Sequence, residues 1–206
     1  MFKRINKLLG GFAVSVAILV GASAATIGVA SAAPTDQAAA EAKARNYFTN
    51  IEVVDQNGQR LNFYDDVLKD KVVAINFIFT NCQGACPLMT KNLTFVRDML
   101  GGEVGKSVHF VSISIDPLRD TPAAMKEFAQ THDADHAGWT RITGDPDKIA
   151  AIVKKLCSNT DDPEAHTTQK LAANVRTAHW TKIAPNKPPH GVVERLKMMI
   201  EEDAGS

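Results

Sequence analysis

Cysteine is scarce in this chain, whose 206 residues include three, at positions 82, 86 and 157. So few cysteines exclude a small scaffold held together by disulfides, and a chain of this length buries an adequate core without them. A second pair of closely spaced cysteines is missing, so thiols do not supply the four ligands of a structural zinc site. Net charge is missing as well, because 23 basic residues balance 23 acidic ones. This balance argues against nucleic acid as a partner.

The first 33 residues have the organisation of a leader segment. An uncharged apolar run extends from Leu8 toward Ala33 and ends in the small-residue pattern Ala30-Ser31-Ala32. The basic residues before it are Lys3, Arg4 and Lys7. The pattern is typical of a secretory signal peptide, and an N-terminal membrane anchor is the alternative because the run is long enough to span a bilayer. Both interpretations predict an exported protein, in the periplasm or on the outer face of the cytoplasmic membrane. Without 1–33 the chain has 20 basic and 23 acidic residues.

Strand and helix patterns alternate through the rest of the chain. Residues 34–49 are an alanine-rich lead-in segment, and residues 50–203 form the predicted domain. Two continuous apolar runs, 71–79 and 107–116, are rich in β-branched and aromatic residues. Such runs are typical of strands that are buried on both faces of a sheet.

Turn and capping signals divide the remaining segments. "DQNGQ" predicts a hairpin within 51–68, and a helical pattern runs from Pro87 to Gly101-Gly102. Thr121-Pro122 and Asp145-Pro146 each start a helix. The remaining elements are short strands at Trp139–Thr143, 167–173 and 180–184 and a last amphipathic helix through Val192 and Ile200. This order predicts an α/β fold, a thioredoxin-like sandwich with a central mixed β-sheet flanked by helices.

Cys82 and Cys86 follow the first buried strand and precede a helix, which is where α/β sheets usually place their sites. Unpaired N–H groups and the dipole at a helix N-terminus stabilise thiolates. At helical spacing the two side chains lie on one face. The pair could therefore chelate a soft ion such as Cu(I), exchange disulfides as a redox couple, or form a structural disulfide. Cys157, on the apolar face of a helix, is expected to be a buried thiol.

A copper site with two thiolates needs at most one further ligand, and histidine is a suitable candidate. In a thioredoxin-like sheet, the hairpin strand after the third helix runs antiparallel to the central strands, so the start of the predicted strand after position 166 is expected beside their carboxyl ends. His166 directly precedes this strand and is therefore expected to face Cys82 and Cys86. The other histidines are expected at the surface or in the core, and they are His109, His132, His136, His179 and His190.

"FIFTNCQGACPLMT" contains a strand followed by T-x-C-x-x-x-C-P, and "VSISIDPLRDTPAAMKEFA" contains D-P-x-x-D-T-P. In both blocks the chain resembles the Sco/SenC family of copper-binding proteins. His166, followed by Asn174 and Trp180, resembles the family's ligand histidine and the strand pair after it. The resemblance covers roughly 50–200, which is nearly all of the predicted domain.

The resemblance implies a metallochaperone that takes part in maturing the CuA centre of cytochrome c oxidase. Cys82 and Cys86 would then be thiolate ligands and His166 the third ligand, for Cu(I) or Cu(II). Asp116, Asp120 and Thr121 match the D-P-x-x-D-T-P loop, which is expected near the site. For Asp120 and Thr121 a structural role in a turn and a helix cap is favoured.

The alternative function is a thiol–disulfide oxidoreductase that reduces the cysteines of a partner protein. The same two thiols would serve, one attacking and one resolving. The implied partners are a cytochrome c oxidase subunit or another copper-accepting protein, and for the redox function a thioredoxin-like reductant.

Overall fold

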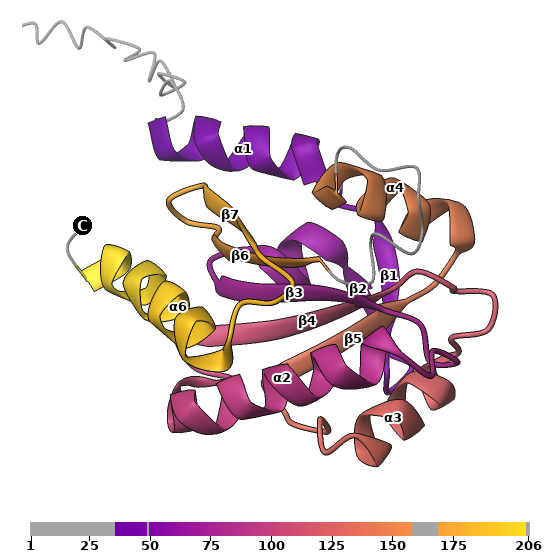
Figure 1. The fold of residues 1–206 in the computed structure, drawn as a ribbon. Helices are drawn as coiled ribbons and strands as arrows, with labels where there is room; N and C mark the ends of the chain where they lie inside the picture. Colours follow the sequence, from indigo (N-terminus) through magenta and orange to yellow (C-terminus); the bar gives the residue numbers. More distant parts are fainter. Residues whose placement is uncertain (1–35, 49, 158–168, 205–206) are drawn as a thin grey trace, which may run out of the picture. The chain divides into compact units, whose positions relative to one another are not determined.

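Within residues 36–48, 50–157 and 169–204, which the computed structural model describes, seven strands form one mixed sheet in the order β2-β1-β5-β4-β3-β6-β7 (Figure 1). The strands are β1 (Glu52–Asp55), β2 (Arg60–Asn62), β3 (Val72–Ile78), β4 (Val108–Ser114), β5 (Trp139–Thr143), β6 (Lys170–Asn174) and β7 (His179–Ile183). The helices are α1 (Asp36–Phe48), the π-helical turn η1 (Phe63–Leu68), α2 (Ala85–Leu100), the 3-10 turn η2 (Gly101–Glu103), α3 (Pro122–Thr131), α4 (Pro146–Cys157) and α6 (Pro189–Ala204). The predicted strands within 71–79 and 107–116 are confirmed as β3 and β4, each somewhat shorter than the apolar run that contains it.

The middle of the sheet is parallel and its borders are antiparallel. β3 pairs in parallel with β4, and β4 with β5. The hairpin β6–β7 adds antiparallel to β3, and the hairpin β1–β2 adds antiparallel to β5. Every residue of β3 is buried, because helices cover both faces of the sheet. This burial explains why the strand reads as an unbroken apolar run.

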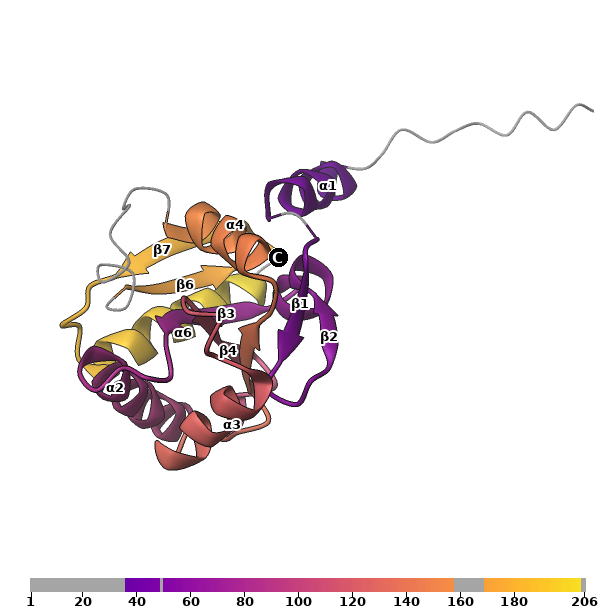
Figure 2. The same ribbon diagram turned by 90° about the vertical axis from the view of Figure 1, so that its right-hand side faces the viewer.

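Two apolar clusters lie on opposite faces of the sheet. One joins the sheet to α1, η1 and α4, through residues that include Phe48, Phe63, Ile149 and Leu156. The other joins it to α2 and α6, through residues that include Leu93, Val96, Val192 and Leu196. Figure 2 shows α4 and α2 on opposite sides of the strands. Helices α2 and α4 present apolar stripes at the spacing expected from the sequence.

The predicted helix starts are confirmed at α3 and α4 and shifted at α2. The Thr121 hydroxyl accepts a hydrogen bond from the N–H of Ala124, and the Asp145 carboxylate accepts one from the N–H of Lys148. Helix α2 begins at Ala85 rather than Pro87. Proline is tolerated inside the first turn because the N–H groups of that turn lack intrahelical acceptors anyway. Cys86 is therefore a helical residue.

The hairpin after α4 has the predicted direction. β6 runs antiparallel to β3, and Lys170 at its start pairs with Asn76 near the carboxyl end of β3. The strands span Lys170–Asn174 and His179–Ile183, against predictions of 167–173 and 180–184. His166 lies outside the described residues, so its place beside the thiols stays a prediction.

The lead-in segment contains α1, whose last residue, Phe48, is buried in the core. The predicted leader, 1–33, lies outside the described residues, and its interpretation as signal peptide or anchor stays a prediction. So do the boundaries at 34–49 and 50–203. No helix within the described part of the chain is long and apolar enough to cross a membrane.

Candidate functional site: a thiol pair at the start of α2

A tight turn between β3 and α2 holds the first cysteine. The N–H of Cys82 donates to the carbonyl oxygen of Phe79 at 3.1 Å, and the N–H of Cys86 donates to Cys82 Sγ at 3.4 Å. Gly84 at the N-cap position has no side chain to accept from the helix. Cys82 Sγ therefore takes the place of a capping group at the N-terminus of α2.

The expectation that both thiols project from one face of a helix is wrong, because only Cys86 belongs to the helix. Cys82 precedes α2, which begins at Ala85. The turn that folds Cys82 back over the first N–H groups of the helix brings the two residues together. Both are free thiols in the structure.

The two thiols ionise differently. Burial is the largest influence on Cys82 and opposes its ionisation, but hydrogen bonds from the N–H groups of Cys86, Gly84 and Ala85 and from the Cys86 thiol outweigh it, so the pKa of Cys82 lies below its ordinary value. Burial raises the pKa of Cys86 to about 12, helped by the nearby negative charges of Cys82 and Asp120. The partly exposed sulfur of Cys82 thus ionises first as the pH rises, and the buried sulfur of Cys86 keeps its proton to higher pH.

Apolar side chains enclose Cys86, which has no exposed surface. Ile78, Met125 and Phe128 form a small cluster with it, and Cys82 packs against the edge of this cluster. The cluster joins the end of β3 to α3, so the second thiol sits in a dry environment between these elements. This enclosure explains the high pKa of Cys86.

A buried carboxylate connects the cysteine turn to the loop after β4. Asp120 is 1% exposed, and its Oδ1 accepts from Thr80 N–H at 2.9 Å and from Thr80 Oγ1 at 2.7 Å. Its Oδ2 accepts from Ser114 Oγ at 2.6 Å. The loop that was expected near the site is thus bonded directly to the residue two positions before Cys82.

The structural roles favoured for the same loop are confirmed. Thr121 caps α3, and Asp120 organises the turn that begins at Asp116, whose carbonyl oxygen accepts from the Asp120 N–H at 2.9 Å. Asp116 itself pairs with the exposed Arg119 at 2.6 Å. Sequence reasoning missed Thr80 and Ser114 as partners of Asp120, although each lies at or just after the end of a central strand.

The histidines within the described residues have separate surroundings. His109 lies on β4 opposite Val73, toward the amino ends of the strands, where burial lowers its pKa. His136 Nδ1 accepts from the Gly138 N–H at 3.0 Å, and His179 contacts Glu202 at 2.8 Å. His190 is exposed at the start of α6.

His132 lies closer to the thiol pair than its sequence context suggested. Its ring packs against the Phe128 ring at a tilt of 57°, with centroids 4.4 Å apart. Together with Thr80, Asn81 and Glu127 it lines a mostly polar pocket of about 290 Å³ beside the cysteine turn. The position follows from the packing of the C-terminus of α3 against that turn, which no local pattern in the sequence reveals.

The donor set that the described residues offer consists of the two sulfurs. Among these residues, no three histidine, cysteine or acidic side chains are grouped closely enough to hold a metal ion. Two thiol sulfurs at one helix start suit a soft ion such as Cu(I) and do not suit a hard ion that prefers oxygen. Cys157 is buried on α4, and burial raises its pKa to about 11, so it is the buried thiol that the sequence predicted.

Fold and site together define a thioredoxin-like protein with an asymmetric thiol pair at a helix N-terminus. Residues 39–201 match the model of the SCO1/SenC family. The chain belongs to this family.

Among the curated proteins, the SCO1 protein homolog of Bacillus subtilis is 36% identical over 89 residues, which are 43% of this chain and 46% of that protein. The chain spans about half the length of the curated relatives that it matches. A SCO1/SenC family lipoprotein from Bacillus anthracis has a similar structure, with a TM-score of 0.61 and 29% identity over 72% of this chain and 92% of that one.

Two further solved structures are similar. ScoI of Bradyrhizobium japonicum with copper bound has a TM-score of 0.59 and 27% identity, covering 72% of this chain and 96% of that one. BsSco, a member of the Sco family of cytochrome c oxidase assembly proteins, has a TM-score of 0.61 and 24% identity, covering 73% and 91%. The thioredoxin-like fold expected from the sequence is thereby confirmed.

Proposed function

We propose that this chain is an exported copper metallochaperone. In this proposal Cys82, Cys86 and His166 bind Cu(I) or Cu(II), and the protein delivers the metal to the CuA site of cytochrome c oxidase or a similar cuproenzyme. Membership of the SCO1/SenC family supports the proposal, as do the copper bound to Bradyrhizobium japonicum ScoI and the assembly role named for BsSco. The observation that carries it is that both the Cys86 N–H, at 3.4 Å, and the Cys86 thiol donate hydrogen bonds to Cys82 Sγ, so that two soft donors lie side by side.

The different ionisation of the two thiols fits a protein that first captures copper and then releases it. Cys82 is the partly exposed thiol with the lowered pKa, so it is the sulfur that forms a thiolate more readily and meets an incoming ion first. Cys86, with a pKa of about 12, must give up its proton when it binds. That proton competes with the metal for Cys86, which favours release to an acceptor by ligand exchange.

The direction of β6 supports His166 as the third ligand. Lys170 starts this strand opposite Asn76, and Asn76 lies two residues before the end of β3. His166 lies four positions before Lys170, and an extended chain spans at most about 14 Å over four positions. The segment between Lys170 and His166 is therefore long enough for His166 to approach Cys82 at the carboxyl edge of the sheet.

Export is part of the proposal. The basic, apolar and small-residue pattern of 1–33 supports it, and a similar protein from Bacillus anthracis is a lipoprotein. The periplasm or the outer face of the cytoplasmic membrane is the proposed location.

The test is a competitive Cu(I) titration of the reduced protein against a chromophoric chelator under anaerobic conditions. We expect one copper per chain and a loss of about tenfold or more in affinity for His166→Ala, since one of three ligands is removed. His190→Ala is the matched control, because it removes an exposed histidine at the start of α6, and we expect it to leave affinity unchanged.

A Cys82→Ala/Cys86→Ala variant separates specific binding from adventitious binding. If this variant binds copper as well as the wild type does, the chaperone function is wrong. If His166→Ala binds as tightly as the wild type while the double cysteine variant does not, His166 is not the third ligand and the proposed ligand set is wrong in that residue.

The asymmetric pair favours one second candidate, a thiol–disulfide oxidoreductase. The Cys82 thiolate attacks a disulfide sulfur of the partner, forms a mixed disulfide and expels one partner thiolate. Cys86 then loses its proton and attacks Cys82 Sγ, which releases the second partner thiolate and leaves a Cys82–Cys86 disulfide. Two electrons pass to the partner, and a thioredoxin-like reductant restores the dithiol.

The reduction potential of the pair tests this second candidate. A potential within the range of known reducing thiol pairs supports it, and trapping of a mixed disulfide by Cys86→Ser identifies Cys82 as the attacking thiol. A very low potential, as in structural disulfides, would exclude turnover as a reductase.

A further inference from the structure

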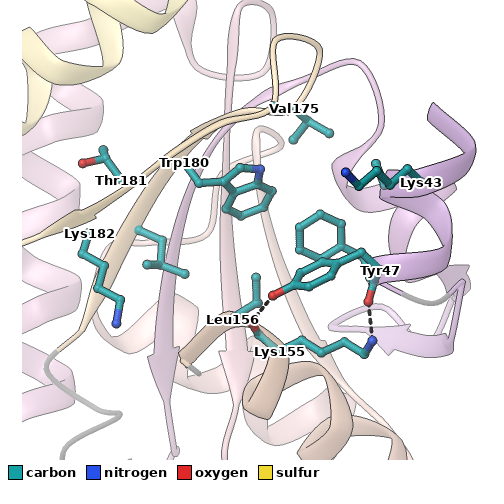
Figure 3. A pocket seen from close by; sticks show the side chains of 12 residues that line it. Lys43, Tyr47, Lys155, Leu156, Val175, Trp180, Thr181 and Lys182 are labelled. Atoms are coloured by element: carbon teal, nitrogen blue, oxygen red, sulfur yellow. Dashed lines mark hydrogen bonds between the residues drawn. The ribbon is translucent and has the colours of Figure 1, made fainter. Parts of the chain in front are cut away.

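A large cavity lies on the face of the sheet that carries α1 and α4, away from α2 and the thiol pair. It has a volume of about 630 Å³, within the range of small-molecule sites. Figure 3 shows side chains from α1, α4 and the β6–β7 hairpin around it. The copper and redox functions proposed above use none of its residues.

Aromatic rings form one wall of the cavity. The Trp180 and Phe48 rings lie 4.8 Å apart between centroids, and the Tyr47 and Phe48 rings lie 4.9 Å apart, edge to face. Leu156, Leu171 and Val175 add aliphatic surface. The interior therefore suits an apolar body of rings or methylene groups.

Lysines provide the charge around this apolar interior, and the residues described as lining it include no acidic side chain. Lys155 donates to the carbonyl oxygen of Tyr47 and lies 5.2 Å from the centre of the Tyr47 ring. Among the residues that the structure describes, the ammonium groups of Lys43 and Lys182 form no ion pair. In Figure 3 these two lysines lie on opposite sides of the rings. A lysine that has no ion-pair partner among the described residues and lies beside an apolar cavity matches one anionic group on an apolar ligand.

Strand geometry directs one of these cations toward the cavity. Trp180 and Lys182 are two residues apart on β7 and project from the same face of the strand. Lys182 is also close enough to Cys157 to oppose the rise in that thiol's pKa. The aromatic wall and the cation thus come from one short strand, whose position is fixed by its pairing with β6.

We propose that this cavity binds an amphiphilic carboxylate of the size of a fatty acid. Its apolar chain lies against Trp180, Phe48 and Leu171, and its carboxylate lies near Lys182 or Lys43. Charge complementarity and the volume carry the proposal, and it is independent of the thiol chemistry on the other side of the sheet.

The protein contains its own reporter for this site. Of its two tryptophans, Trp180 lines the cavity, whereas Trp139 is fully buried in the cluster on the opposite face. The experiment is a fluorescence titration of the lipid-free protein with 12-bromododecanoate. The bromine of this ligand quenches the fluorescence of a nearby indole. We expect saturable quenching in the wild type and none in Trp180→Phe.

Charge variants test the role of the lysines. We expect Lys43→Glu/Lys182→Glu to weaken dodecanoate binding about tenfold or more, because the lysine that attracts the carboxylate, whichever of the two it is, becomes a repulsive glutamate. Lys148→Glu/Lys154→Glu is the matched control, with the same change in net charge on exposed positions of α4 outside the cavity, and we expect less than a twofold change. Thermal unfolding of each variant verifies that it is folded, and dodecanoate should raise the unfolding temperature of the wild type.

Four results would overturn the proposal. Two concern fluorescence, namely an absence of saturable quenching in the wild type and quenching that persists in Trp180→Phe. Two concern affinity, namely equal affinity for dodecanol and dodecanoate, and an equal loss of dodecanoate affinity in the cavity lysine variant and in its control. A fifth concerns an occupant from the chain itself, since Asp161, Asp162 and Glu164 follow α4 in the sequence. If dodecanoate binds only when these three residues are changed to amides, the chain's own acidic stretch is the occupant and the proposal is wrong.

Discussion

Two cysteines four positions apart differ in ionisation because they differ in solvation and hydrogen bonding. The N–H groups of α2 reach Cys82, whereas Cys86 lies within an apolar cluster. The sequence predicted the position of the pair, because a buried strand followed by a helix fixes it. It did not predict which thiol ionises first, since that depends on Met125 and Phe128, which come from a distant helix.

Alkylation of the native protein tests this difference. With reduced, metal-free protein at neutral pH, we expect iodoacetamide to modify Cys82 first and to leave Cys86 and Cys157 largely unmodified, because a depressed pKa places the Cys82 thiolate at lower pH. Peptide mass spectrometry assigns the sites. Equal rates for Cys82 and Cys86 would contradict the assigned asymmetry, and all three thiols should react in denaturant.

Asp120 shows how one buried residue can serve both the turn and the site. Its charge raises the pKa of Cys86, and its oxygens hold Thr80 and Ser114. We expect Asp120→Asn to lower the free energy of unfolding by about 2 kcal/mol, since a charged acceptor is lost and an amide N–H₂ group faces a donor. We also expect it to lower the pKa of Cys86.

Urea unfolding and the pH dependence of alkylation measure the two effects. Asp116→Asn is the matched control, because Asp116 pairs with the exposed Arg119 and such pairs contribute about 0–1 kcal/mol. An Asp120→Asn variant with wild-type stability and wild-type Cys86 reactivity would refute both roles.

At the scale of elements, local signals located most boundaries. Thr121 and Asp145 mark helix starts because their side chains satisfy N–H groups of the helix that follows. The start of α2 was missed because a thiol, rather than a hydroxyl or carboxylate, stands at its N-terminus. The placement of His132 beside the cysteine turn depends on how α3 packs, so no segment of sequence contained it.

The segments that precede β4 and β5 contact each other at two glycines, Gly105 and Gly138. A Cβ placed on Gly138 would lie 2.4 Å from the backbone nitrogen of Gly105, which cannot move aside like a flexible side chain. We expect Gly138→Ala to cost about 2–4 kcal/mol of unfolding free energy. Gly102→Ala is the control, since a Cβ there meets nothing within 4 Å, and it should be close to neutral. Similar stabilities for the two variants would show that the contact is not restrictive.

At the scale of the whole molecule, the sheet separates two chemically different regions. The thiol pair lies at the start of α2, and the apolar cavity lies between α1, α4 and the hairpin. The order of strands and helices predicted the central sheet, but the cavity was not predicted. It depends on α1 meeting the β6–β7 hairpin, and these segments are far apart in the chain.

The buried thiols make the stability of the whole fold sensitive to alkaline pH. The folded pKa values of Cys86 and Cys157, about 12 and about 11, exceed the ordinary value of 9.0. The stabilisation from these neutral thiols is therefore fully present below pH 9 and is lost as the pH rises from there toward the folded values.

Chemical unfolding of the reduced, metal-free protein between pH 7 and about 10.5 measures this loss. We expect the unfolding free energy to decline less steeply with pH in Cys86→Ala/Cys157→Ala than in the wild type. The smaller side chains also lower the unfolding free energy by an amount that does not depend on pH, and this does not affect the comparison of slopes. Parallel pH profiles would mean that the buried thiols do not account for the sensitivity.

The hydrogen bond from the Cys86 N–H to Cys82 Sγ makes one backbone amide an indicator of what the thiol pair is doing. A sulfur that is protonated, ionised, oxidised or bound to a metal differs in its strength as an acceptor, and the Cys86 amide proton faces that sulfur directly. Its NMR chemical shift and its rate of exchange with solvent should therefore change with each state. Copper loading and disulfide formation could then be followed, and told apart, on the same atom without any added probe.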